Sequence, residues 1–225
     1  MRPSLRTERI RLKRRQFNTL AASLGLGLAH NARAQGTPVA GQEYSNISSP
    51  PPMAIPPGTV DVMEFFSFAC PHCFEFEPTL ESWLGRKPAG VRFHRSPVPF
   101  LQNYANFQPM YFALEAMGLA DTMPAKVFNA VHVERQRLDK PEDIAAFMAR
   151  NGVDATRFMS LFNSFGVRTK VQQANAVFEA FGIPEIGVPA LAVQGRWVTS
   201  PRQARGASQA LAVVDYLAGQ ARTGH

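Results

Sequence analysis

The only two cysteines of this 225-residue chain are separated by two residues, in Cys70-Pro71-His72-Cys73. A disulfide between them closes a ring too short to staple distant parts of a fold, so the pair suits reversible redox chemistry better than structural support. The same spacing supplies half of a zinc site, but zinc needs two further ligands. The chain has no second cysteine pair, and its histidines are scattered along the sequence. We therefore expect a redox pair, no metal, and no cofactor other than the disulfide itself.

The position of Cys70 favours a reactive thiolate. Pro71 suits the first turn of a helix, where its missing N–H has no intrahelical partner. A cysteine just before that turn lies beside unpaired backbone N–H groups and the positive end of the helix dipole, which lower its pKa. His72 adds a hydrogen-bond donor or a positive charge near the Cys70 sulfur. Cys73, one helical turn further along, is expected to be the more buried partner. A stabilised thiolate means a stabilised reduced form, so the sequence predicts an oxidising disulfide.

Short strands and one helix must position this pair. The apolar run Val60–Phe66 predicts a buried strand, and the segment Pro71–Leu84 predicts the helix that follows it. Val91–Arg95 predicts a second strand. Near the other end of the chain, residues 188–193 and 197–199 flank the turn Gln194-Gly195-Arg196 and predict a hairpin.

Between these strand regions the pattern becomes helical. Cap residues, first-turn prolines and terminal glycines recur four times between residues 103 and 166. They predict helices from Asn103 or Asn106 to before Gly118, from Asp121 onward, from Asp139 to near Gly152, and from Asp154 to Gly166. Further helices are predicted at about 168–181 and 201–218. The order predicts an α/β fold in which a small sheet domain is interrupted by helices.

Two segments resemble the DsbA family of thiol–disulfide oxidoreductases. Residues 63–73, ending in Cys70-Pro71-His72-Cys73, are similar to the family's active-site segment, and Gly187-Val188-Pro189-Ala190 is similar to its cis-proline loop. The likeness covers about residues 44–220. It implies a thioredoxin-like fold over residues 58–102 and 168–220, with an inserted all-helical domain over 103–167.

The resemblance also implies roles for individual residues. Cys70 exchanges with the substrate sulfur and Cys73 is its internal partner. Val188 and Pro189, joined by a cis bond, lie across from Cys70 and bind an extended substrate.

The resemblance places an acid behind the cysteines, and Glu64 occupies that position. A carboxylate within an apolar strand is costly to bury unless it is paired or protonated, so it either tunes and relays protons or faces a solvated strand end. The family has a basic partner in the next strand, where this sequence offers Arg95 in a different context, so the pairing stays open. Four apolar residues are candidates either for a substrate groove or for the core: Phe68, Phe100, Phe107 and Met110.

The net charge of +7 belongs to the N-terminus. Residues 1–34 hold eight of the 24 basic residues and one of the 17 acidic ones, so the remainder is neutral and the sequence does not favour nucleic-acid binding. A basic stretch, the apolar run Thr19–Ala29 and the motif Ala32-Arg33-Ala34 predict a cleaved export signal. The twin-arginine and general routes both remain open. Residues 35–57 predict a proline-rich lead-in without a core of its own.

The sequence thus predicts a periplasmic dithiol oxidase that donates its Cys70–Cys73 disulfide to newly exported proteins with free thiols. The resemblance implies a DsbB-like, quinone-linked membrane oxidase as the partner that restores the disulfide. Two alternatives stay open. One is a disulfide isomerase or dedicated reductant, and the other is a peptide-binding holdase whose cysteines are incidental.

Overall fold

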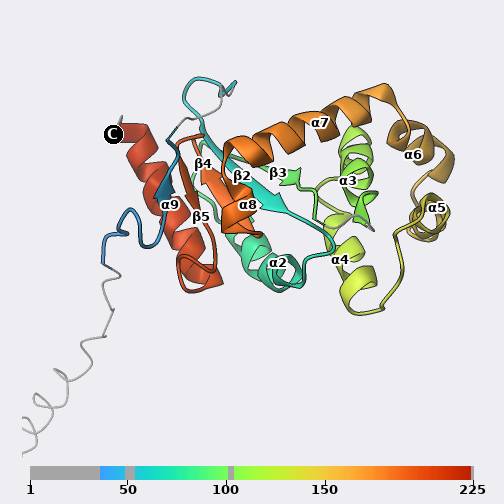
Figure 1. Cartoon of the computed structure of the whole chain (residues 1–225), viewed down its shortest axis with the longest axis horizontal. Helices are drawn as coiled ribbons and strands as arrows, with labels where there is room; N and C mark the ends of the chain where they lie inside the picture. Colours follow the sequence, from blue (N-terminus) through green and yellow to red (C-terminus); the bar gives the residue numbers. More distant parts are fainter. Residues whose placement is uncertain (1–35, 49–53, 101–103, 224–225) are drawn as a thin grey trace, which may run out of the picture. The chain divides into compact units, whose positions relative to one another are not determined.

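The computed structural model describes residues 36–48, 54–100 and 104–223 (Figure 1). The predicted export signal therefore lies outside the described residues, as does part of the lead-in. No helix in the described ranges is both long and apolar enough to cross a membrane.

A mixed sheet of five strands forms the centre of the fold, in the order β1-β5-β4-β2-β3. These strands are β1 (Ser45–Asn46), β5 (Trp197–Thr199), β4 (Ala190–Val193), β2 (Val60–Phe66) and β3 (Val91–Pro97). The β2–β3 pair is parallel, and the other neighbouring pairs are antiparallel. Parallel strands need a long crossover, which here is the helix that begins at the cysteines.

The unit β2–α2–β3 positions the redox pair, and its prediction was accurate. Strand β2 and helix α2 (Pro71–Leu84) have the predicted bounds. Strand β3 runs two residues beyond the predicted end, because Ser96 and Pro97 still pair with the end of β2. β2 is buried over its whole length, as expected of a central strand covered on both faces.

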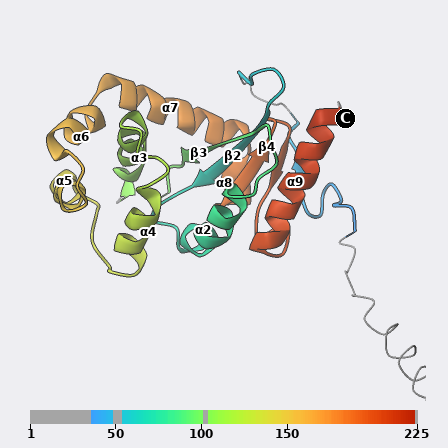
Figure 2. The same ribbon diagram turned by 180° about the vertical axis from the view of Figure 1, so that it is seen from behind.

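Alternate side chains of β2 pack on opposite faces of the sheet. Val60 and Val62 join a core with α2 and α9 (Ala207–Thr223), while Met63 and Phe65 pack with residues of α7 and α8. Figures 1 and 2 show α2 and α9 on one side of the sheet and α7 and α8 on the other. Because the side-chain period of a strand is two, residues at every second position of β2 face α2 and α9, and those between them face α7 and α8.

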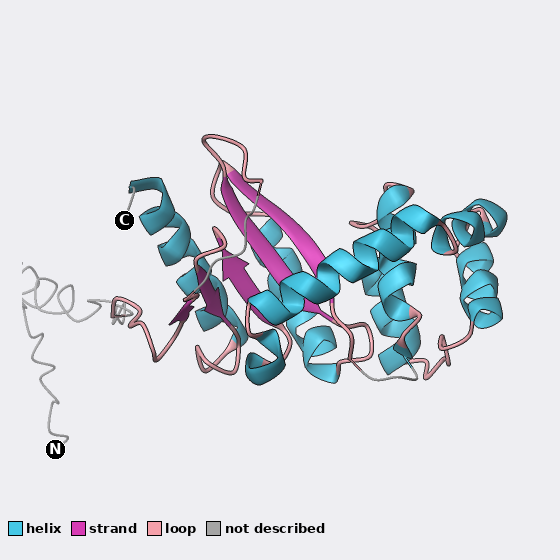
Figure 3. Cartoon of the chain, turned by 45° about the horizontal axis from the view of Figure 1, so that its top comes forward, coloured by secondary structure: helices cyan, strands magenta, loops and turns pink. Residues whose placement is uncertain are grey.

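A group of helices lies beyond the β2–β3 end of the sheet, and Figure 3 shows these helices set apart from the strands. They are α3 (Phe107–Ala116), α4 (Pro124–His132), α5 (Pro141–Arg150) and α6 (Ala155–Phe162), with α7 (Phe165–Ala180) running from them back to the sheet. Their apolar core includes both cysteines and also Phe66, the last residue of β2, and Phe68, two residues further on.

Several helix boundaries differ from the predicted ones. Helix α4 begins at Pro124 rather than at Asp121, and α7 begins at Phe165 rather than near residue 168. Gly166 does not end a helix but lies in the first turn of α7, because Ser164 caps that helix by accepting a hydrogen bond from the Val167 N–H at 3.1 Å. The last helix begins at Ala207 rather than Pro201, since Arg205 and Gly206 have positive φ angles of 62° and 158° that a helix cannot contain.

The predicted hairpin is present, although β4 begins at Ala190, two residues later than predicted. Three residues connect the paired Val193 and Trp197. Gln194 and Gly195 have positive φ angles of 54° and 66°, and the Arg196 N–H donates to the Val193 carbonyl oxygen at 3.0 Å, which closes a tight turn within this connection. Two elements were not predicted. The short helix α8 (Ile183–Ile186) precedes the cis-proline loop, and β1 of the lead-in adds an edge strand to β5.

Candidate active site

Cys70 lies where the loop after β2 enters α2. Its backbone is extended, with φ −83° and ψ 117°, which makes it the N-cap residue, and Pro71 occupies the first helical turn. Both cysteines are free thiols, and both are buried, Cys70 being 2% exposed and Cys73 0%. The predicted placement of the pair at a strand-to-helix junction is therefore confirmed by the geometry.

The pKa values of the two thiols are shifted in opposite directions. A hydrogen bond from the Cys73 side chain is the largest of the effects that lower the pKa of Cys70 to about 6. Backbone N–H groups of Cys73 and His72 and the charge of His72 act in the same direction, and burial opposes them. Burial is also the main reason why the pKa of Cys73 is raised well above its ordinary value. Near neutral pH the site therefore holds one thiolate and one thiol.

His72 contributes from the surface. Its side chain is 74% exposed, and its Nδ1 lies 3.1 Å from Glu75 Oε2. The hydrogen bond that His72 donates to the Glu75 carboxylate is the main reason why the pKa of His72 is raised. The imidazole is thus a solvent-exposed group near Cys70 whose charged form is favoured, and not a buried donor to the sulfur. Glu75 was not singled out from the sequence, although its spacing of three residues from His72 on a helix favours such a pair.

The cis-proline loop reaches the sulfur from the other half of the chain. The Val188–Pro189 peptide bond is cis, as the resemblance implied. The Sγ of Cys70 lies 3.5 Å from the Val188 carbonyl oxygen, across 118 positions of sequence, and donates a hydrogen bond to it only when the thiol is protonated. The antiparallel pairing of β2 with β4, which starts directly after Pro189, brings this loop to the cysteines.

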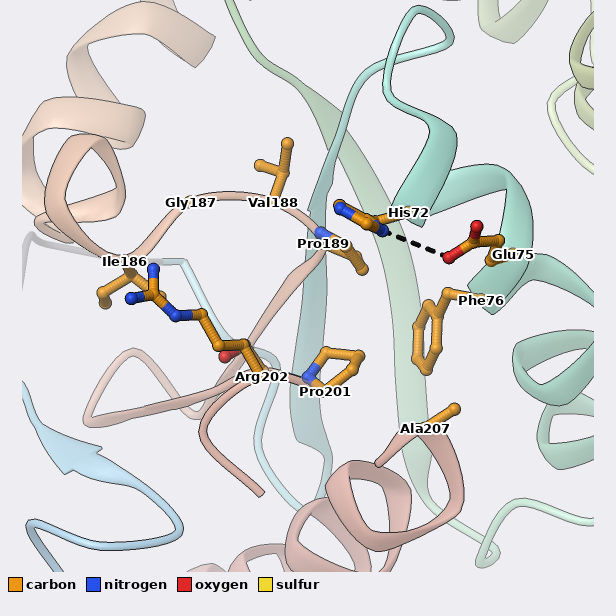
Figure 4. A pocket seen from close by; sticks show the side chains of 11 residues that line it. His72, Glu75, Phe76, Ile186, Gly187, Val188, Pro189, Pro201, Arg202 and Ala207 are labelled. Atoms are coloured by element: carbon orange, nitrogen blue, oxygen red, sulfur yellow. Dashed lines mark hydrogen bonds and ion pairs between the residues drawn. The ribbon is translucent and has the colours of Figure 1, made fainter. Parts of the chain in front are cut away.

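A groove of about 570 Å³ begins at this loop and runs along α2, and we refer to it as the active-site groove (Figure 4). Its apolar lining consists of Phe76, Ile186, Val188, Pro189, Pro201 and Ala207. The charged side chains along it are the His72–Glu75 pair on one side and Arg202 on the other. Such a mixture of apolar wall and few polar groups is typical of a ligand site.

Behind the cysteines, Arg95 joins two buried carboxylates. Glu64 and Arg95 are neighbours across the parallel strands β2 and β3. The Nε of Arg95 donates to Glu64 Oε2 at 2.9 Å, and its Nη2 donates to Glu77 Oε1 at 2.8 Å. All three side chains are at most 8% exposed. The pairing that the sequence left open is therefore present, and Glu64 does not face a solvated strand end.

One guanidinium for two buried carboxylates leaves this cluster short of positive charge. Arginine keeps its charge in proteins, so it is the carboxyl groups whose protonation changes. Burial raises the pKa of Glu64 to about 7, although Arg95 opposes the shift. Burial raises the pKa of Glu77 as well. The charge of Glu64 in turn contributes to the raised pKa of Cys73. The cluster therefore holds an exchangeable proton near neutral pH beside the buried thiol.

Glu77 was missed from the sequence, although a signal existed. It lies four residues after Cys73, on the face of α2 that also carries the buried Phe76 and Leu80. An acid on the apolar face of a helix needs a partner. The local pattern does not say that this partner lies on β3.

His132, at the end of α4, holds the loop that leads into Cys70. Its Nε2 lies 2.8 Å from the carbonyl oxygen of Phe68. Its ring stacks on that of Phe74, with centroids 5.1 Å apart and planes inclined by 12°. The residues around His132 in the sequence predict no role for it, because nothing local marks its distant partners.

Most of the groove candidates belong to the core. Phe68, Phe107 and Met110 are between 0 and 3% exposed and pack within the helical core, whereas Phe100 is 40% exposed. None of the four lines the active-site groove. In the described residues, no group of three or more His, Cys, Asp or Glu side chains is arranged to hold a metal ion.

Comparison with known proteins identifies the family. The sequence profile of the DSBA-like thioredoxin domain matches residues 101–218. The chain is 40% identical over 211 residues to the thiol:disulfide interchange protein DsbA of Bordetella pertussis, covering 92% of this chain and 97% of that protein. The chain belongs to the DSBA-like thioredoxin domain family. It is also 34% identical over 204 residues to the DsbA of Burkholderia cepacia, covering 91% of this chain and 95% of the relative.

Solved structures agree with this assignment. The crystal structure of Pseudomonas aeruginosa DsbA is similar with a TM-score of 0.77 and 36% identity, covering 83% of this chain and 96% of that one. The predicted α/β class, a thioredoxin-like fold with inserted helices, is thereby confirmed. As a member of the DSBA-like family, the chain is a thiol:disulfide oxidoreductase.

Proposed function

We propose that this protein is a periplasmic dithiol oxidase that donates a Cys70–Cys73 disulfide to newly exported proteins with free thiols. The observation that carries the proposal is the contrast between the two thiols. The pKa of Cys70 is lowered to about 6 at the helix N-terminus, while that of Cys73 is raised well above its ordinary value. A pair in which one thiolate is stabilised favours its reduced form and therefore gives up its disulfide readily.

The exchange proceeds in two steps that move two electrons and two protons. A client thiolate attacks Cys70 Sγ of the oxidised protein, the Cys70–Cys73 bond breaks, and Cys73 leaves as a thiolate that takes up a proton. A second client thiolate then attacks the client sulfur of the mixed disulfide, and Cys70 leaves as a stable thiolate. The client is oxidised to a disulfide, and the protein is reduced to a Cys70 thiolate and a Cys73 thiol. Of the two protons that the client thiols give up, one passes to Cys73 and the other to solvent. A low leaving-group pKa accelerates the second step.

The surrounding residues support these steps. Pro71 begins the helix at Cys70, and His72 adds positive charge that favours the Cys70 thiolate. Glu64 is close enough for its charge to raise the pKa of Cys73, so it can relay the proton that Cys73 takes up. Its own pKa of about 7 suits a group that must both hold and release a proton near neutral pH.

Val188 and Pro189 form the wall against which the client lies. The Val188 carbonyl, 3.5 Å from the Cys70 sulfur, is placed to accept a hydrogen bond from an extended peptide whose cysteine reaches that sulfur. The apolar part of the active-site groove then takes side chains near the client cysteine. Backbone pairing of this kind suits unfolded clients, because it does not depend on one sequence.

The proposal extends to the organisation of the chain. Residues 1–34 are a cleaved export signal and 35–57 a lead-in. Residues 58–102 and 168–220 form the thioredoxin-like domain, and 103–167 the inserted helical domain. A DsbB-like, quinone-linked membrane oxidase restores the disulfide after each turnover, and the protein itself needs no cofactor beyond that disulfide.

The test is a redox equilibrium of the purified protein with glutathione, with the thiols of Cys70 and Cys73 trapped by alkylation. We expect the pair to be oxidising compared with glutathione. A potential more negative than the roughly −220 to −260 mV of a cytosolic glutathione pool would overturn the direction of electron flow and favour a reductant.

Two variants tie the reaction to the residues. Cys70→Ser should abolish oxidation of a reduced client, whereas Cys73→Ala should accumulate a mixed disulfide between Cys70 and added disulfide-bonded peptide. Full activity of Cys70→Ser would contradict the proposal.

A further inference from the structure

The active-site groove is electrostatically one-sided. The carboxylate of Glu75 is already paired with His72, at 3.1 Å. Arg202, on the opposite side, has no carboxylate within ion-pairing distance in the part of the chain that the structure describes. Figure 4 shows its side chain extending from the Pro201 side of the groove toward Ile186, away from the His72–Glu75 pair.

A nearby acid within the fold does not neutralise this arginine. Glu185 precedes Ile186 in α8, but its carboxylate lies beside Gly182, 3.7 Å from where a Cβ at that position would stand. The groove therefore offers an exposed cation next to an apolar wall, with its other charges balanced by each other. An occupant with a negative charge at that side is electrostatically complementary.

The occupant that fits is an extended peptide. The wall beside Arg202 is apolar, and it continues to the Val188 carbonyl at the Cys70 sulfur. In an extended chain, side chains two residues apart point to the same side. An acidic residue two positions from the client cysteine therefore faces the groove together with that cysteine.

We propose that Arg202 makes the protein prefer client segments that carry an acidic side chain two residues from the reacting cysteine, by pairing with that carboxylate across the groove. The inference rests on the proposed function and names a specificity for it. The pair stabilises the complex from which the client thiolate attacks Cys70. Because Arg202 is exposed, the effect is that of a surface ion pair, roughly a two- to five-fold preference in rate.

The experiment compares oxidation rates of three synthetic peptides that each contain two cysteines. One cysteine is flanked on both sides, two positions away, by Glu, Gln or Lys, so the result does not depend on the direction in which the peptide binds. The flanking charges also alter the peptide's own thiol pKa. Each rate is therefore divided by the rate of the same peptide with the Arg202→Met variant, which lacks the charge but keeps an unbranched side chain.

We expect the normalised rate of the Glu peptide to exceed that of the Gln peptide by roughly two- to five-fold, and the difference to shrink with added salt. Arg202→Glu should favour the Lys peptide instead. Arg86→Met removes the same charge at an exposed position after α2 that does not line the groove, and it should keep the native preference.

Equal normalised rates for the three peptides would overturn the inference while leaving the proposed function intact. An identical loss of preference in Arg86→Met would also overturn it, because general charge would then be responsible. If the native protein oxidises none of the peptides, the proposed function itself fails, and the specificity fails with it.

Discussion

Replacing Cys73 by alanine separates the causes of the low pKa of Cys70. In the native protein this pKa is about 6 against an ordinary value of 9.0, and the hydrogen bond from the Cys73 side chain is the largest contribution. The alanine variant removes that donor but keeps the helix N-terminus and His72. It also leaves a single thiol in the chain, so the titration reports on one group.

The size of the effect follows from the strength of one such bond. A hydrogen bond to a charged acceptor contributes about 1.5–3 kcal/mol, and one pKa unit corresponds to about 1.4 kcal/mol. The pKa of Cys70 should therefore rise by about one to two units, to between about 7 and 8. At pH 7 the thiolate fraction would fall from about nine-tenths to half or less.

The assay is the rate of alkylation of Cys70 as a function of pH, checked by the ultraviolet absorbance of the thiolate. Cys73→Ser is the matched control, because its hydroxyl is of similar size and can still donate to the sulfur. We expect the serine variant to titrate close to the native protein and the alanine variant clearly above it.

The same shift has a consequence for stability. Because the folded pKa lies below the unfolded one, the thiolate stabilises the reduced fold fully above pH 9 and progressively less as the pH falls through about 6. At pH 7 this stabilisation is at most about 1 kcal/mol, because solvent screening reduces it. In Cys73→Ala most of this stabilisation should vanish.

An unchanged titration midpoint in Cys73→Ala would refute this reasoning. The helix N-terminus and His72 would then account for the whole shift, and His72→Ala would become the informative variant. Equal upward shifts in the alanine and serine variants would instead implicate packing around the sulfur.

Three further predictions concern the groups around the cysteines. Arg95→Met should destabilise the protein by about 3–5 kcal/mol in chemical denaturation, because it leaves Glu64 and Glu77 buried without their cation, and Arg95→Lys should cost less. In the oxidised protein, where no thiol titrates, the raised pKa of Glu64 should reduce stability as the pH rises from about 4.5 through about 7. Glu64→Gln should remove up to roughly 3 kcal/mol of that decline in the free energy of unfolding between pH 5 and 8. If the pH dependence of stability is unaltered in this variant, another group causes the decline. His132→Ala should cost about 1 kcal/mol and speed hydrogen exchange at residues 67–70, since the Phe68 carbonyl loses its partner, whereas His132→Gln should restore protection.

The surroundings of Cys70 along the chain could be predicted from the sequence, because neighbouring residues determine them. A strand ending just before Cys70 and a proline just after it determine that the sulfur lies at a helix N-terminus, and both signals lie within a few residues. The bounds of β2 and α2 were accurate for the same reason. Where local signals competed, as at Ser164 and Gly166, the sequence pattern favoured the glycine while the serine side chain set the boundary.

The tertiary structure alone decided how distant groups meet. Nothing in the pattern around Glu77 indicates Arg95, because their contact depends on how α2 packs over β3. Whether Phe68 lines a groove or fills the core likewise depended on the helices that cover it. The sequence by itself thus determined the chemistry of the two sulfurs and the elements that carry them. Packing between remote segments decided what surrounds them, since burial and pairing follow from which faces meet and not from the order of residues.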